Sequence, residues 1–264
     1  MDSKEYIQAN RTAWNQAAPI HAEQNFQILL RDCQIPGHTC LDEIEKRLLE
    51  EIGAAGKDVA QLCCNNGREL LSIKNMGAAR CVSFDLSDVF IEQARALAAV
   101  AGLDCRFVCA DVNEMDPGYD GAFDLVYITV GTLGWMPDLG GFFAAARRLL
   151  RSGGWLLVYE MHPILDMFDA EPGGTFPLRH SYFRAGPYAD EEGLDYYGNS
   201  AYDSSILYWF YHRLSDIIQS YLENGFRLTS FQEYGHNVSN VFKGMEKQEA
   251  GLPLSYPLLA RCLS

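Results

Sequence analysis

The residues best suited to chemistry lie in one short segment that has the pattern of a buried strand, a turn and the start of a helix. The segment is Val59-Ala60-Gln61-Leu62-Cys63-Cys64-Asn65-Asn66-Gly67-Arg68-Glu69. A strand–turn–helix of this kind aims backbone N–H groups and a helix N-terminus at whatever lies above the sheet. About 18 residues after Gly67, a second strand ends in Asp85, at the spacing where a carboxylate reaches ribose hydroxyls. Together these signals predict a nucleotide-type ligand.

Two further strands are followed by side chains that would face the same ligand. Asp111 and Val112 come just after the strand Cys105–Cys109, and Thr129 ends the strand that begins at Phe123. The carboxyl ends of parallel strands meet at one edge of a sheet, where ligands bind. Asp111 alone would be an ordinary loop acid, and Asp85 alone could merely cap the helix that starts near Ser87. Their order along the chain favours a binding site.

The elements that must position these residues alternate between strands and helices. The predicted strands are 58–63, 80–84, 105–109, 123–129, 155–159, 206–212, 226–231 and a final one near 253–260, and the predicted helices include 68–76, 87–102, 138–150 and 215–224. Such alternation predicts an α/β fold: a doubly wound, mostly parallel, seven-stranded Rossmann-like sheet with helices on both faces. Because of its prolines, we expect the final strand at an edge or terminal position rather than a central one.

Two segments depart from the alternation. Residues 1–56 are predicted to be a helical segment that covers the site, with a helix over Ser3–Ala18, a mixed connector over Asn15–Gly37 and a helix capped by Thr39. Residues 57–264 then form the main domain, with an insertion over 162–205. The insertion is rich in aromatic residues, namely Phe168, Phe176, Tyr182, Phe183, Tyr188, Tyr196, Tyr197 and Tyr202. It is interpreted as a lid, a dimer contact or plain core; we favour a lid that also contributes to a homodimer.

Composition restricts the partners. The 264 residues carry a formal net charge of −14, which repels phosphate backbones and anionic lipid, so neither nucleic acid nor a membrane is expected as a partner. We find no apolar run close to the roughly 20 residues that a membrane span needs. We also find no signal-peptide pattern, so we expect a cytoplasmic location. The eight cysteines lack a C-x-x-C pair, and no metal site is expected.

In this order, the strand-end signals resemble those of the class I S-adenosylmethionine-dependent methyltransferases, from about Asp58 onward. The family's first motif is usually an acid followed by three alternating glycines, at positions occupied here by Gln61, Cys63, Asn65 and Gly67. Asp85 matches the ribose-binding acid, and Asp111 with Val112 the adenine-contacting position. The segments Phe123-Asp124-Leu125-Val126-Tyr127 and Leu150-Arg151-Ser152-Gly153-Gly154 resemble the fourth-strand motif and the turn before the fifth strand.

The resemblance implies S-adenosylmethionine as cofactor and a small molecule as methyl acceptor. The implied cofactor-binding residues are Gln61, Cys63, Cys64, Asn65, Gly67, Glu69, Asp85, Leu86, Asp111, Val112 and Thr129. Asn65 is a reasonable substitute for glycine because asparagine tolerates a left-handed backbone. Gln61 offers no charge to the methionine ammonium, so either its side-chain oxygen suffices or another acid contributes, with Glu69 as the candidate.

Two histidines are candidates for catalysis. His162 follows the fifth strand and has the unperturbed pKa of a general base, although it could equally just begin the insertion. His21, in the N-terminal segment, is expected either to line the site or to pack on the domain. Two other functions stay open: a nicotinamide-dependent oxidoreductase, although the first turn lacks G-x-G-x-x-G, and a non-catalytic nucleotide-binding protein that keeps the methyltransferase fold.

Overall fold

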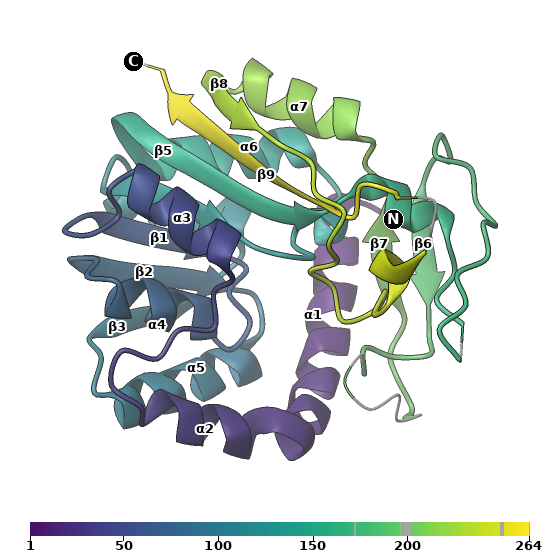
Figure 1. Ribbon diagram of the computed structural model, residues 1–264, viewed down its shortest axis with the longest axis horizontal. Coiled ribbons are helices and arrows are strands. Elements are labelled where there is room, and N and C mark those ends of the chain that lie inside the picture. Colours follow the sequence, from purple (N-terminus) through teal and green to yellow (C-terminus); the bar gives the residue numbers. More distant parts are fainter. Residues whose placement is uncertain (172, 196, 198–201, 249–250, 264) are drawn as a thin grey trace.

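A seven-stranded sheet with the order β3-β2-β1-β4-β5-β9-β8 forms the centre of the computed structural model, which describes residues 1–171, 173–195, 197, 202–248 and 251–263 (Figure 1). The strands are β1 Asp58–Leu62, β2 Arg80–Asp85, β3 Cys105–Cys109, β4 Phe123–Ile128, β5 Leu150–Met161, β8 Phe226–Phe231 and β9 Ser255–Cys262. β1 to β5 are parallel, whereas β9 is antiparallel to both β5 and β8. The predicted fold class is confirmed.

Helices cover both faces because both faces of the central strands are apolar. On one face, α3 (Glu43–Glu51), α4 (Arg68–Asn75) and α5 (Asp88–Ala101) pack on side chains such as Val59, Leu125 and Leu157. On the other, α6 (Leu139–Leu149) and α7 (Leu214–Glu223) pack on Val126 and Leu156. The short 3₁₀ helices are η2 Val112–Glu114, η3 Pro117–Tyr119, η4 Leu133–Trp135, η5 Pro163–Met167 and η6 Met245–Lys247. The parallel strands therefore deliver their carboxyl ends to one edge.

The expected edge position of the last strand is wrong. β9 is paired on both sides, with β5 and with β8. Pro257 is accommodated because the β8–β9 register ends at the pair Phe231↔Leu258, so Pro257 lies one residue beyond it. The Pro257 carbonyl accepts from the backbone N–H of Gln232, beyond the end of β8. Since N–H and C=O of one residue point to the same neighbour in an antiparallel ladder, the missing N–H falls where that ladder has already ended.

The N-terminal region is more helical than expected. α1 spans Ser3–His21 and is followed by a π-helical turn over Ala22–Phe26 and by α2 over Gln27–Cys33, in place of the connector predicted from Asn15. In Figure 1, α1 stands across the carboxyl ends of the parallel strands. α3 is capped by Asp42 rather than by Thr39, because Asp42 and Glu45 form a reciprocal capping box. Among the described residues, no helix is both long enough and apolar enough to cross a membrane.

The insertion brings a second, two-stranded sheet beside α1. β6 (Pro187–Asp190) pairs antiparallel with β7 (Leu207–Phe210), so the strand predicted at 206–212 exists but does not join the main sheet. The buried Asn10 of α1 fixes this sheet: its side-chain amide donates to the Tyr208 carbonyl at 2.9 Å, and its oxygen accepts the Tyr208 N–H at 2.7 Å. Tyr196, one of the aromatic residues singled out above, lies outside the described residues. The division into residues 1–56 and 57–264 stays a prediction.

Candidate active site

The turn after β1 keeps the backbone of a glycine-rich loop although two of its glycine positions are occupied by other residues. Cys63 (φ 55°) and Asn65 (φ 50°) are in the left-handed region, which costs about 1–2 kcal/mol for a residue with a side chain. Hydrogen bonds hold the turn: the Cys63 N–H donates to the Phe84 carbonyl and the Gly67 N–H to the Cys64 carbonyl, both at 2.8 Å. Gly67, also left-handed, is the N-cap of α4. These backbone N–H groups hold the turn in place at the strand ends.

Asp85, at the end of β2, closes the turn from the side. Its carboxylate accepts the Asn65 N–H at 2.7 Å and the Ser87 N–H at 2.9 Å. Burial raises the pKa of Asp85 to about 6, although the N–H groups of Ser87, Asn65 and Leu86 act in the opposite direction. A carboxylate held this way has further lone pairs available. Asp85 is thus fixed relative to the turn and can accept from ribose hydroxyls.

A cavity of about 1680 Å³ opens above these strand ends. Of the predicted cofactor-binding residues, those in its wall are Cys63, Cys64, Asn65, Glu69, Asp85, Leu86, Asp111, Val112 and Thr129. Gly67 and Gln61 do not line it. Gly67 lies behind the turn, where a Cβ would meet Phe107 at 2.3 Å. Gln61 is completely buried below the cavity floor, with its Nε2 3.4 Å from Thr129 Oγ1.

Another part of the cavity wall is aromatic. Trp14 of α1 meets Trp135 edge-on with ring centroids 5.1 Å apart, and Trp135 meets Trp209 at 5.0 Å. Trp209 Nε1 donates to Asp166 Oδ1 at 3.1 Å, and burial raises the pKa of Asp166 to about 6. These four side chains all line the cavity. They come from α1, η4, η5 and β7, so sequence reasoning had only the aromatic richness of the insertion as a signal for this wall.

Glu160 fixes a loop in the cavity wall. It is buried in β5, and its carboxylate accepts the N–H groups of Gly131 at 2.7 Å and of Leu133 at 3.0 Å. Burial raises the pKa of Glu160 to about 7, against the effect of these hydrogen bonds. The residues Thr129, Val130, Gly131 and Thr132 line the cavity. Glu160 is therefore a positioning residue for the loop that follows β4.

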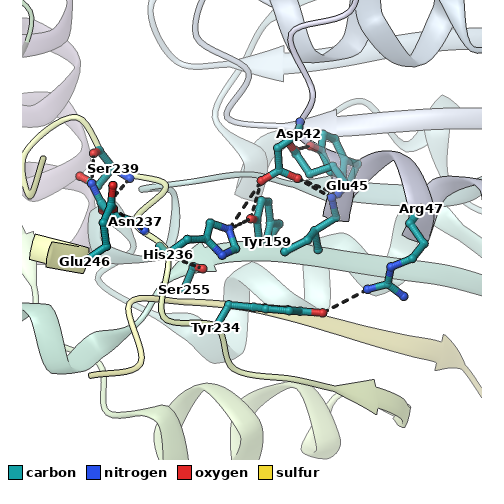
Figure 2. Close-up of polar contacts among 12 residues, drawn as sticks. Asp42, Glu45, Arg47, Tyr159, Tyr234, His236, Asn237, Ser239, Glu246 and Ser255 are labelled. Atoms are coloured by element: carbon teal, nitrogen blue, oxygen red, sulfur yellow. Dashed lines mark hydrogen bonds and ion pairs between the residues drawn. The ribbon is translucent and has the colours of Figure 1, made fainter. Parts of the chain in front are cut away.

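The start of α3 adds acids that were not predicted as site residues. Asp42 and Glu45 line the cavity, and Figure 2 shows Asp42 facing Tyr159 of β5. Tyr159 Oη donates to Asp42 Oδ2 at 2.6 Å and lies 2.7 Å from His236 Nε2. Tyr127 Oη donates to Glu45. The capping-box spacing of Asp42 and Glu45 is the sequence signal that would have located this helix start.

Neither predicted catalytic histidine lies in the cavity wall. Both ring nitrogens of His162 are engaged: Nδ1 accepts the Ile164 N–H at 3.1 Å, and Nε2 lies 3.0 Å from Glu233 Oε1. His21 is 2 % exposed, and its Nε2 donates to the Leu194 carbonyl at 2.6 Å. Burial lowers the pKa of both imidazoles. The structure thus brings neither residue together with the cofactor-binding residues, and it places both in packing positions.

The raised carboxyl pKa values predict that the ligand-free protein becomes less stable as pH rises. Glu45 and Glu160, with pKa values of about 7, keep protons in the folded state that the unfolded chain loses near its ordinary values. The folded state then binds more protons than the unfolded state between about pH 4 and 7, so the free energy of unfolding falls across that window. The loss is roughly 3 kcal/mol for each group at full shift. Urea unfolding from pH 5 to 8 measures it.

The variant Glu45→Gln separates this effect from the general repulsion of an acidic chain. Its stability should fall less steeply with pH than that of the wild-type protein, because one of the proton-holding groups is gone. A wild-type stability that rises between pH 5 and 8, or an equal slope in the variant, would contradict the assignment.

Comparisons with known proteins agree with this geometry. Residues 60–158 match a family model described as a methyltransferase domain. An O-methyltransferase, resE, of Aspergillus sclerotiorum is 25% identical over 213 residues, covering 78% of this chain and 70% of the relative. A crystal structure of an S-adenosylmethionine-dependent methyltransferase from Mesorhizobium loti superposes with a TM-score of 0.61 at 22% identity, covering 82% of this chain and 97% of that one. Geranyl diphosphate C-methyltransferase from Streptomyces coelicolor A3(2) gives 0.58 at 12% identity, over 83% and 78%.

The solved structures establish the fold, and the family model covers the segment that builds the strand-end part of the cavity wall. With the strand order and the strand-end acids, these matches show a methyltransferase domain over residues 60–158, in a fold shared with S-adenosylmethionine-dependent methyltransferases. The nicotinamide oxidoreductase interpretation finds no support in these matches.

Proposed function

We propose that this chain transfers the methyl group of S-adenosylmethionine to an apolar small molecule. The observation that carries the proposal is a cavity of about 1680 Å³ whose wall combines the strand-end acids with three tryptophans. It exceeds the roughly 300–1,000 Å³ of a typical small-ligand pocket, so it has room for a cofactor and an acceptor together. The wall at the β1–α4 turn is polar and acidic, whereas Trp14, Trp135 and Trp209 give another part of the wall an apolar surface.

The residues of the polar part of the wall fit the cofactor. Asp85 has carboxylate lone pairs for the two ribose hydroxyls, and Asp111 with Val112 stands at the neighbouring strand end, where the adenine would lie. The turn over Cys63–Asn66 lines the cavity beside the start of α4. When bound, S-adenosylmethionine supplies a methyl group already activated by the positive charge on its sulfur. The protein then has to align the acceptor and exclude water.

The residues of the aromatic part of the wall suit that task. The edge-on tryptophans form a rigid apolar wall, since Gly134 leaves so little room that a Cβ there would overlap the Trp209 ring at 2.1 Å. Asp166 adds one carboxylate whose pKa of about 6, raised by burial, lies near neutral pH. A group of that kind is suited to take a proton from an acceptor hydroxyl or amine. We therefore favour acceptors with an aromatic or aliphatic body and one nucleophilic atom.

Calorimetry on the purified protein tests the proposal first. S-adenosylmethionine and S-adenosylhomocysteine should bind with micromolar affinity, and NAD and NADP should not bind. A methyl-labelled donor offered with phenols, carboxylic acids, amines and thiols should then give labelled product. Failure of the sulfur cofactors to bind to folded protein would refute the proposal. Cofactor binding without transfer to any acceptor class would favour the non-catalytic alternative.

A further inference from the structure

The position that usually carries an acid in the first motif is neutral and out of reach in this chain. Gln61 is fully buried, and it does not line the cavity. Its Nε2 is directed to Thr129, and its Oε1 is a buried acceptor without a hydrogen-bond partner among the described residues. A bound amino-acid ammonium would therefore meet no charge at this position, and the charge has to come from elsewhere in the wall.

Glu45 lies close to the place where that charge is missing. Gln61 of β1 is paired in register with Tyr127 of β4, so the two side chains lie on the same face of the sheet. Tyr127 Oη donates to Glu45 Oε1. Glu45 Oε2 accepts the Asp42 N–H at 3.0 Å, so the carboxylate is held from two sides. Figure 2 shows Glu45 at the start of α3, next to Asp42.

The charges around Glu45 leave this part of the cavity wall negative. Asp42 lies on the same helix start, Glu69 comes from α4, and Arg68 is the nearby cation. Arg68 is already paired, since its Nε lies 2.7 Å from Glu69 Oε1. Burial together with Asp42 and Glu69 disfavours the ionised form of Glu45. A cation bound here would offset that effect.

We propose that Glu45, supported by Glu69, binds the α-ammonium group at the amino-acid end of S-adenosylmethionine and replaces the charge that Gln61 lacks. This inference rests on the proposed function, because it concerns the same cavity. It assigns the ammonium contact to α3 instead of the first strand. Glu45 comes from α3 and Glu69 from α4, whereas Asp85 ends β2, so in this assignment the two carboxylates act on the amino-acid end and Asp85 on the ribose.

Two probes that differ only in that end test the assignment by calorimetry. S-adenosylhomocysteine carries the amino-acid group, whereas 5′-methylthioadenosine lacks it. The variant Glu45→Gln keeps the shape of the side chain and its acceptor for the Asp42 N–H. It should weaken S-adenosylhomocysteine binding at least tenfold and leave 5′-methylthioadenosine binding within about twofold, as expected for loss of one charged hydrogen bond. Glu50→Gln, an exposed neutralisation on the same helix, should change neither.

The wild-type protein gives an independent readout that requires no variant. The groups facing Glu45 are Asp42 at its own helix start, Tyr127 of β4, Tyr159 of β5, Glu69 of α4 and Cys40 before α3. Because a bound cation favours the ionised carboxylate, S-adenosylhomocysteine should release more protons on binding at pH 7 than 5′-methylthioadenosine does. Asp85 and Glu160 affect both probes alike, so the difference between the probes reports on Glu45.

The outcomes separate this inference from the proposed function. If neither probe binds to the wild-type protein, the proposed function itself fails. If both bind but Glu45→Gln weakens them equally or not at all, or if proton release is the same for both probes, the ammonium assignment is overturned and the function stands. Should Glu45→Gln fail to fold, judged by 5′-methylthioadenosine binding and thermal unfolding, the wild-type proton release still decides.

Discussion

Replacing Gly67 with alanine should lower the free energy of unfolding by about 3 kcal/mol. Two effects add at this position. The backbone has φ +73°, where a residue with a side chain loses about 1–2 kcal/mol. A Cβ would also stand 2.3 Å from Phe107 Cε1 and 3.1 Å from Ala94 Cβ, and such overpacking costs typically 1–3 kcal/mol. Phe107 is 4% exposed and has little room to move. Urea unfolding with a linear extrapolation measures the loss.

Gly121→Ala is the matched control for this prediction. Gly121 has φ +60°, but nothing lies within 4 Å of the added Cβ, so only the backbone cost of about 1–2 kcal/mol remains. In the Gly67→Ala background, Phe107→Leu should recover part of the stability because it removes the atom that clashes. Equal losses for Gly67→Ala and Gly121→Ala would show that the close approach of α4 to β3 is not what requires this glycine.

The parallel half of the fold could be predicted because its signals are local. In β1 and β2 the apolar run, the turn residue and the helix start follow one another within about 15 residues of the chain, and the predicted ends differ from the observed ones by a residue or so. The position of β9 could not be predicted this way. It depends on pairing with β5 and β8. A proline predicts an edge strand unless one knows where the β8–β9 hydrogen bonds end, and the sequence does not give that position.

The residues of the site also fall into two groups: those that could be predicted from local sequence and those whose position depends on tertiary packing. Asp85, Asp111 and Thr129 were predicted because each follows its own strand, and parallel strands bring their carboxyl ends together without further information. Glu45 and Asp166 were missed because they reach the cavity from α3 and from the insertion, and only tertiary packing decides which face of those segments is turned inward. His162 was chosen for the chemistry of its side chain, whereas its hydrogen bonds to Ile164 and Glu233 depend on the fold. The homodimer and the cytoplasmic location stay predictions.

Replacing Asp85 with alanine should weaken S-adenosylhomocysteine binding at least a hundredfold, or about 2.7 kcal/mol. The carboxylate does two things that alanine cannot do. It accepts from the ribose hydroxyls in the proposed complex, and it accepts the N–H groups of Asn65 and Ser87 at 2.7 and 2.9 Å. Without it, two N–H groups lose their partner at about 1–3 kcal/mol each, and the left-handed conformation of Asn65 loses the contact that holds it.

Asp85→Asn distinguishes the two contributions. The asparagine oxygen accepts from one backbone N–H, whereas its NH₂ group cannot accept from the other, so an intermediate loss of affinity is expected. Asp104→Asn, an exposed neutralisation just before β3, controls for the change in net charge and should leave binding unaltered. Calorimetry with S-adenosylhomocysteine and with 5′-methylthioadenosine should report the same loss for Asp85→Ala, because both carry the ribose. A loss confined to S-adenosylhomocysteine would place Asp85 at the amino-acid end and exchange its role with that of Glu45.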